Sequence, residues 1–347
     1  MYYNTPPAKN QVLVQPDGEV LHDRTVMGSE RPWREKKLKN EMLANAYEGI
    51  DYSKAERLRD CGQYLRFRVY PDGEKRLDMM NSCRVRLCPM CSWRRSLKAF
   101  YNTNAVCMEL ARFNEYRYIM LTLTVRNCTG DALSSQIDFL FEAFNRFMGY
   151  AAIKKSVKGW MRSLEVTHNV NRESEWFDTY HPHFHLLLCV PKSYFSGKYY
   201  IAQKKWSELW QKAARLDYTP SVDVRAIKPS GKHGLADMLD DKELKTLAIA
   251  DACGEVTKYT VKDADYIIPD DWDLTTEAVA VLDQALANRR LVAFGGIMKK
   301  IRALLQLEDE DSGDLVNVGE EPARDDVYKL VKYFWYSGAR DYYSMKE

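Results

Sequence analysis

Alternating apolar and polar residues predict β-strands through the middle of the chain, and apolar residues at helical spacing predict helices between them. The expected strands are residues 118–125, 160–168, 181–190 and 221–227, and the expected helices are residues 132–150, 198–215 and 235–262. The order β-α-β-β-α-β-α predicts an α+β fold in which a compact antiparallel sheet has helices packed on one side.

The flanking segments divide the rest of the chain. Residues 1–55 are polar and contain several prolines, so we expect a partly disordered arm with a short helix around 38–48. The expected domains are a cysteine module over 56–100 that leads into a helix at 94–112, a sheet domain over 110–270, and a helical C-terminal region over 271–347 with a break at Gly295–Gly296 and an acidic linker at 307–326.

The strand His181–Val190 carries half of the six histidines of the chain. Its alternation places His181, His183 and His185 on one face, while the other face is apolar throughout and suits a core. Imidazoles lined up in this way indicate a metal site. The alternative is a set of histidines that hydrogen-bond within the fold.

A third ligand is expected from the neighbouring strand. Glu165 lies on the polar face of residues 160–168, and an open site of imidazole and carboxylate suits the hard cations that activate phosphate. The alternative for Glu165 is a solvated carboxylate. His168 falls on the opposite face and is a weaker candidate.

A second group of chemically active side chains is expected on the helix at 235–262. Glu255, Tyr259 and Lys262 are spaced to share one helix face. A tyrosine nucleophile needs a nearby cation or metal because its ordinary pKa is about 10, and a carboxylate can act as general base. Taken alone, the group also fits an exposed helix face.

Four cysteines are close together in sequence. Cys83, Cys88 and Cys91 are separated by four and two residues, and Cys61 precedes them across a predicted hairpin turn at Pro71–Gly73. This layout predicts a zinc ribbon with a tetrahedral structural Zn²⁺. The alternative is four buried, inert thiols.

The net charge of +2 conceals an uneven distribution. Residues 307–326 carry a charge of −8, so the remainder carries +10. Basic clusters interleaved with aromatic residues suit a surface that binds phosphates and stacks on bases, and we expect DNA contacts from Arg84, Arg86, Trp93, Arg94 and Arg95. No apolar run suggests a membrane span or a signal peptide, so a cytoplasmic protein is expected.

Several blocks together carry a family resemblance. They are Leu121–Thr124, His181–His185 with Phe184 between the paired histidines, Glu255-x3-Tyr259-x2-Lys262, the cysteine-rich block Cys83–Arg95, and Arg289–Gly296. In combination they resemble the single-tyrosine rolling-circle replication initiators of small bacterial plasmids, within the HUH endonuclease superfamily. The resemblance covers about residues 56–300.

The resemblance implies an HUH nuclease core and a role for each candidate residue. His183, His185 and Glu165, with His181 as an alternative ligand, would hold Mg²⁺ or Mn²⁺ against the scissile phosphate. Tyr259 would cut one strand of the double-strand origin, leaving a 5′-phosphotyrosine and a 3′-OH primer, and Lys262 would neutralise phosphate charge or assist Tyr259. Glu255 would activate water at termination. Origin DNA, a host helicase and a DNA polymerase are the implied partners.

Three rival interpretations remain open. An HUH transposase or relaxase shares the nicking chemistry, although the cysteine block and Glu255 favour the replication initiator. A zinc-containing DNA-binding regulator that does not cut DNA leaves the histidine strand and Tyr259 unused. A small-molecule metal hydrolase needs neither the basic-aromatic clusters nor the tyrosine. If Tyr259 is not the nucleophile, Tyr266 is the next candidate.

Overall fold

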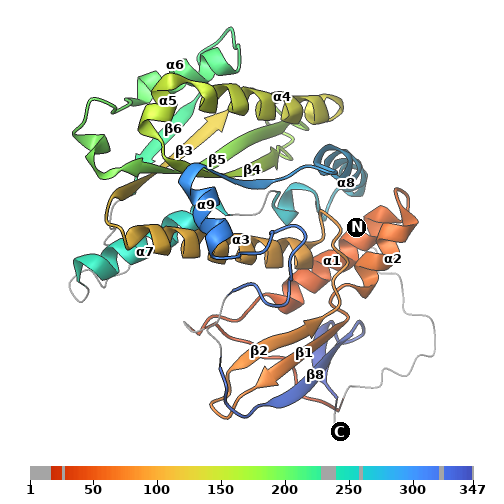
Figure 1. Ribbon diagram of the computed structural model, residues 1–347. Helices are drawn as coiled ribbons and strands as arrows, with labels where there is room; N and C mark the ends of the chain where they lie inside the picture. Colours follow the sequence, from red (N-terminus) through yellow and green to blue (C-terminus); the bar gives the residue numbers. More distant parts are fainter. Residues whose placement is uncertain (1–16, 26–27, 228–239, 258–260, 320–323, 346–347) are drawn as a thin grey trace. The chain divides into compact units, whose positions relative to one another are not determined.

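The computed structural model describes residues 17–25, 28–227, 240–257, 261–319 and 324–345. The chain forms two compact units (Figure 1). The first, here called the cysteine unit, comprises Met1–Arg94, Tyr266–Ala280 and Leu315–Glu347. The second, here called the histidine unit, comprises Arg95–Asp265 and Val281–Asp314.

The histidine unit is built on an antiparallel sheet, as expected. Within the described residues the strand order is β6-β3-β5-β4-β7. The strands are β3 (Tyr116–Thr124), β4 (Gly159–His168), β5 (Tyr180–Pro191), β6 (Val222–Ala226) and β7 (Val292–Gly295). The sequence pattern did not predict β7. Gly295 and Gly296 let it pair with β4, because a Cβ on Gly295 would lie 2.1 Å from the Trp160 ring and one on Gly296 would lie 2.2 Å from the Lys158 carbonyl oxygen.

Helices cover both faces of this sheet, so the expectation of helices on one side was wrong. On one face, α4 (Gly130–Gly149) packs against β5, with the ring centroids of Phe144 and Phe184 5.5 Å apart. The adjacent α6 (Gln203–Ala213) buries Trp206 and Trp210 beside α4.

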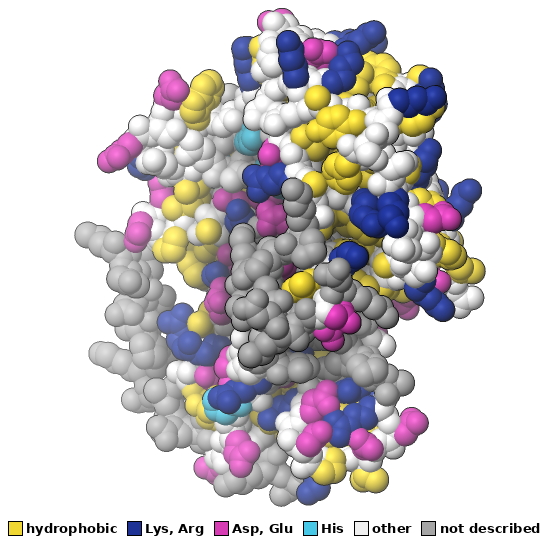
Figure 2. All heavy atoms as spheres, turned by 90° about the vertical axis from the view of Figure 1, so that its left-hand side faces the viewer, with side chains coloured by type: hydrophobic (Ala, Val, Ile, Leu, Met, Phe, Trp, Pro, Cys, Tyr) yellow, Lys and Arg dark blue, Asp and Glu magenta, His cyan; other side chains and the backbone are white. Residues whose placement is uncertain are grey.

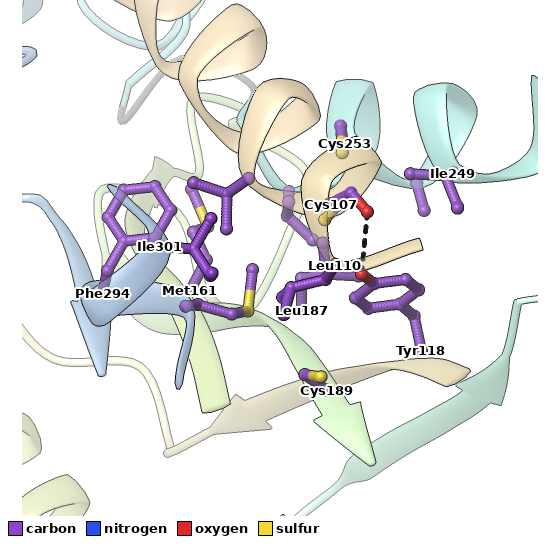
Figure 3. Packing of buried hydrophobic residues seen from close by; sticks show 14 residues of the cluster. Cys107, Leu110, Tyr118, Met161, Leu187, Cys189, Ile249, Cys253, Phe294 and Ile301 are labelled. Carbon is purple, nitrogen blue, oxygen red and sulfur yellow. Dashed lines mark hydrogen bonds between the residues drawn. The ribbon is translucent and has the colours of Figure 1, made fainter. Parts of the chain in front are cut away.

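The other face carries a second core under α3 (Pro89–Ala111), α7 (Asp241–Val256) and α9 (Gly296–Leu304) (Figure 3). Leu187 and Cys189 belong to this core, although they share a face of β5 with the histidines. The β5 face that carries the histidines is polar only in its first half. Its second half is apolar and is buried beneath α3, α7 and α9.

The helix expected at 235–262 is shorter than predicted. α7 ends at Val256, where the Thr257 hydroxyl donates to the Cys253 carbonyl oxygen at 2.7 Å. Lys262 lies beyond the helix, immediately before the short 3-10 helix η3 (Asp263–Asp265), so it does not share a helix face with Glu255. Tyr259 lies outside the described residues.

The cysteine unit contains a second antiparallel sheet, ordered β2-β1-β8-β9 within the described residues. Its elements are α1 (Trp33–Tyr47), α2 (Tyr52–Asp60), β1 (Tyr64–Val69), β2 (Lys75–Met80), β8 (Lys329–Tyr336) and β9 (Asp341–Ser344). The C-terminal region expected to be helical over 271–347 is helical only in part, because residues 329–336 and 341–344 form β8 and β9. Tyr333 and Trp335 are buried at alternate positions of β8, but this alternation is too short to be recognised in the sequence.

Two further segments are more ordered than expected. Within the supposed arm, α1 buries Trp33, Leu43 and Tyr47. The beginning of the acidic segment packs on the histidine unit: the Lys98 ammonium contacts the Glu308 carboxylate at 2.5 Å, and buried Glu310 accepts from the Asn102 side-chain amide at 2.7 Å. Residues 307–314 are therefore not a free linker. No helix among the described residues is long and apolar enough to cross a membrane.

Candidate metal centre

Two strands of the histidine unit bring three candidate ligands together. Glu165 on β4 pairs directly with His183 on β5, so their side chains rise from the same face of the sheet as His185. His185 Nε2 lies 2.9 Å from Glu165 Oε2 and 3.2 Å from His183 Nε2, while His183 Nε2 lies 3.8 Å from Glu165 Oε2. Three potential ligand atoms therefore converge on one point.

The spacing of these atoms suits a divalent cation. Two ligands that meet an ion at right angles, each about 2.1 Å away, lie about 3.0 Å apart. The separations at His185 are close to that value. Two imidazoles and one carboxylate leave open positions for substrate oxygen atoms, as a catalytic site for Mg²⁺ or Mn²⁺ requires.

Outer hydrogen bonds orient both imidazoles. His183 donates from Nδ1 to the carbonyl oxygen of His181 at 2.9 Å, which leaves its Nε2 as the free ligand atom. His185 Nδ1 lies 3.3 Å from the Thr122 hydroxyl on β3. Thr122, from the block Leu121–Thr124, thus supports a histidine of the block His181–His185.

The electrostatics favour metal-binding protonation states. Burial lowers the pKa of His183 to about 4, so its ring is neutral near pH 7. Burial opposes ionisation of Glu165, but the His185 hydrogen bond and the nearby charges of His183, His185 and Lys262 hold its pKa below the ordinary value. A neutral imidazole beside an ionised carboxylate is the state that a cation needs.

The segment after α7 reaches this centre. Lys262 Nζ lies 3.6 Å from Glu165 Oε1, and the Lys262 backbone N–H donates to the Asp265 carboxylate at 3.2 Å. His168 fixes the same segment to the sheet: its Nδ1 contacts the Asp265 carbonyl oxygen and its Nε2 contacts Asp178 Oδ1, both at 2.9 Å. The buried His168 ring also stacks on Tyr180. His168 is therefore part of the site's framework, on the face away from the ligands.

The other candidates take different places. His181 is not in the converging group of described residues; its carbonyl oxygen supports His183 and its ring stacks on the His183 ring. Glu255 is exposed in the last turn of α7 and is also outside that group. Tyr266 is buried, and its hydroxyl donates to the Leu87 carbonyl oxygen at 2.7 Å, so it is a poor substitute for Tyr259 as nucleophile.

The cysteine unit holds a second candidate metal site. Cys61, Cys83, Cys88 and Cys91 are buried together, with Sγ–Sγ distances of 3.6 Å from Cys61 to Cys88 and to Cys91, and 3.8 Å from Cys83 to Cys91. Tetrahedral Zn²⁺ with bonds of about 2.3 Å places its sulfur atoms about 3.8 Å apart. The expected hairpin between Cys61 and Cys83 is present as β1 and β2.

A buried lysine beside the cysteines fits a charged metal centre. Lys37 on α1 is 1% exposed, and its ammonium donates to the carbonyl oxygens of Arg59 and Cys61 at 2.7 and 2.8 Å. Burial lowers its pKa, which opposes the charged form unless a negative group is near. Zn²⁺ with four thiolates carries a charge of −2 and would supply such a group. Neutral thiols would not.

The residues expected to contact DNA near this cluster fall into two groups. Trp93 and Arg94 are buried, and the Arg94 guanidinium donates to the carbonyl oxygens of Leu315 and Val316. These two side chains are therefore not accessible to DNA in this structure, which corrects the expectation that they contact it. Arg84 is exposed, and Arg86 and Arg95 are half-buried.

The sequence pattern missed three supporting residues. Thr122, Asp178 and Asp265 become neighbours of the site only through strand pairing and loop packing. Thr122 could have been noticed in the sequence, since it lies in the block Leu121–Thr124 that contributes to the family resemblance. Asp178 lies in a loop and Asp265 ends the short 3-10 helix η3, and in neither segment does a sequence pattern distinguish them from solvated acids.

The chain is similar to known replication proteins over most of its length. Residues 74–344 match the family Rep_1, described as "Replication protein". The chain is 40% identical over 341 residues to "Protein rep" of Bacillus amyloliquefaciens, covering 94% of this chain and 97% of that protein. It is 34% identical over 333 residues to "Protein rep" of Streptococcus pneumoniae, covering 94% and 95% of the two chains. No solved structure gives a significant match.

Proposed function

Because this chain belongs to the Rep_1 family of replication proteins, we propose that it initiates plasmid rolling-circle replication by nicking one strand of the double-strand origin. The observation that carries the proposal is the convergence of Glu165, His183 and His185 on one point, with Lys262 beside them. A regulator that only binds DNA has no use for that arrangement.

In this mechanism the chain's own residues position and cleave the phosphodiester. Glu165, His183 and His185 would hold Mg²⁺ or Mn²⁺, which would polarise the scissile phosphate when bound. The Tyr259 hydroxyl loses its proton and its oxygen bonds to phosphorus, while the bond to the 3′ oxygen breaks and that oxygen gains a proton. The products are a 5′-phosphotyrosine and a 3′-OH primer. Lys262 offsets negative charge near the reacting phosphate.

Termination needs a second nucleophile, because the motif has one tyrosine. Glu255 is assigned to activate water for that step, so no second protein–DNA bond forms. Its exposed position at the end of α7, four residues before Tyr259 in the sequence, is compatible with this task. Host helicase and DNA polymerase would then extend and displace the strand, and the cysteine unit would carry a structural zinc.

A nicking assay tests the proposal. Purified protein with Mn²⁺ should relax a supercoiled plasmid that carries the origin, and the His185→Ala variant should lose this activity by at least about a hundredfold. His181→Ala is the matched control, since it removes a neighbouring imidazole that is outside the converging group and keeps the carbonyl oxygen that supports His183. Equal activity of wild type and His185→Ala would rule out the metal centre.

A further inference from the structure

The end of the β5 strand away from the histidines has its own surface character. β5 runs from Tyr180 to Pro191, so about 20 Å of strand separates His185 from Pro191 at about 3.3 Å per residue. β3 and β4 begin at this end, as their pairing with Pro191 and Cys189 shows. A surface here is too far from the ligands to be part of the metal centre.

Two stretches of the chain that lack any acidic residue meet at this end. Residues 143–164 and 179–207 contain no Asp or Glu. They are joined where the Ser156 hydroxyl, at the end of α5 (Ala151–Ser156), donates to the Tyr199 carbonyl oxygen at 2.6 Å. Seven lysines from these stretches are exposed: Lys204 and Lys205 on α6, and, outside α6, the five residues Lys154, Lys155, Lys158, Lys192 and Lys198. The result is a local excess of positive charge suited to phosphates.

Aromatic rings are exposed among these lysines. Phe195, Tyr199 and Tyr200 are 47%, 44% and 54% exposed in the segment that follows β5 and includes η1 (Lys192–Phe195). The buried Tyr194 hydroxyl, bonded at 3.2 Å to both the N–H and the carbonyl oxygen of Ile201, ties the two ends of the segment together. The exposed rings are therefore presented from an anchored loop.

We call the five lysines and three aromatic residues the far-end patch. Figure 2 views the molecule from the side on which the loop after β5 lies in Figure 1, and in its upper part Lys and Arg side chains gather beside exposed hydrophobic ones. A pocket of about 470 Å³ continues the patch, lined by residues that include Lys158, Lys300, Tyr116 and Pro191. Glu115 is the one acidic residue in that lining.

We propose that the far-end patch binds single-stranded DNA outside the nicking centre. Lysines that follow a phosphate backbone, combined with aromatic rings that stack on unpaired bases, are the two elements of such a surface. The phosphates of duplex DNA could contact the lysines, but its bases could not stack on the aromatic rings because they are already stacked on each other. The inference rests on the proposed function, which supplies a nicked and displaced strand as the occupant.

Binding of a fluorescent oligothymidine to the full-length protein tests this proposal. The oligomer carries no origin sequence and spans one site of about 4–16 nucleotides. We expect Tyr199→Ala with Tyr200→Ala to weaken binding about tenfold, or about 1.4 kcal/mol. Lys154→Glu with Lys155→Glu should reduce the slope of log affinity against log salt by about 1.4, since each phosphate contact contributes about 0.7.

Matched controls come from the cysteine unit. Tyr52→Ala removes an aromatic ring that is 66% exposed, and Lys329→Glu with Lys332→Glu makes the same change of net charge at exposed positions. These variants should bind oligothymidine as the wild type does, after allowance for net charge. Origin nicking is measured in parallel on a short oligonucleotide that contains the nick site, and the patch variants should nick it at the wild-type rate.

Each outcome decides a different claim. Unchanged oligothymidine binding in the patch variants, with nicking intact, would overturn the patch and leave the proposed function standing. Failure of the wild type to nick would remove the proposed function, while the binding comparison would still report on the patch. Equal loss of duplex and single-strand affinity in the tyrosine variant, or an effect on self-association alone, would also overturn the proposal.

Discussion

The ammonium group of Lys262 lies 3.6 Å from carboxylate atom Oε1 of Glu165, which links the segment after α7 to the metal centre on the sheet. The charge on Lys262 helps to lower the pKa of Glu165.

For Lys262→Met we therefore expect nicking to slow by at least about tenfold. Because the pKa of Glu165 rises without this charge, Mn²⁺ binding should require a higher pH than in the wild type. Nicking rates and Mn²⁺ titrations between pH 5 and 8, at about unit steps, measure both effects. Lys262→Arg keeps the charge and should retain most of the activity; equal loss in both variants would show that charge is not what matters.

Glu255 is predicted to act after the first cleavage. In Glu255→Ala, initial nicking should proceed within about threefold of the wild-type rate, because Glu255 is outside the group of described residues that converge on the metal position. Release of the finished circle should fail, and covalent protein–DNA complex should accumulate. Gel analysis of replication products over time distinguishes the two steps. Normal release of circles by this variant would remove Glu255 from termination.

Strands β3, β4, β5 and β6 of the histidine unit were predictable because apolar and polar residues alternate along them and one face of β5 is apolar throughout. The same alternation placed Glu165 and His183 on one face, which their direct pairing confirms. The alternation did not reveal that helices cover Leu187 and Cys189. Apolar residues that face this second core look the same in sequence as those that face the core under α4. The strand β7, four residues long, is below the length at which alternation is informative.

The candidate site was predictable to the extent that it lies on regular strands. His183, His185 and Glu165 follow from strand periodicity, whereas the approach of Lys262 depends on where α7 ends. The sequence suggested a helix through Lys262, but the helix stops at Val256. Lys262 still reaches Glu165, by way of a turn held by Asp265 and His168. Tertiary hydrogen bonds of this kind leave no periodic trace.

The charge on Lys37 is predicted to support zinc in the cysteine unit. The full-length protein should contain about one zinc per chain, and Cys88→Ser should lose it. Lys37→Met removes the buried ammonium and two hydrogen bonds, so zinc should be lost to a competing chelator at about tenfold lower chelator concentration. Metal analysis after chelator titration measures this. Lys36→Met, the neighbouring substitution on α1, is the control, and equal zinc retention by wild type and Lys37→Met would contradict the charge argument.

The carboxyl group of Asp265 should make stability depend on pH. Burial raises its pKa from 3.8 to about 6, so the folded chain binds this proton more tightly than the unfolded chain does. The contribution of this protonated carboxyl group to the free energy of unfolding is complete below about pH 4 and is lost as the pH rises through about 6. Asp265→Asn should therefore gain about 1–2 kcal/mol over the wild type between pH 4.5 and 7.5, allowing for partial solvent screening. Urea unfolding at both pH values, without added Mn²⁺ or Mg²⁺, measures the gain; a constant difference would show that the carboxyl group titrates normally.

The identity of the nucleophile is the most direct test of the whole account. Wild-type protein is incubated with Mn²⁺ and an origin oligonucleotide labelled on the 5′ side and on the 3′ side of the nick, and the covalent adduct is digested and sequenced by mass spectrometry. The adduct should carry the 3′-side fragment through a 5′-phosphate on Tyr259, and Tyr259→Phe should form no adduct. Tyr266→Phe alters a buried tyrosine whose hydroxyl donates to the Leu87 carbonyl oxygen, and this variant should form the adduct normally. An adduct that persists in Tyr259→Phe would contradict the assignment of Tyr259 as nucleophile.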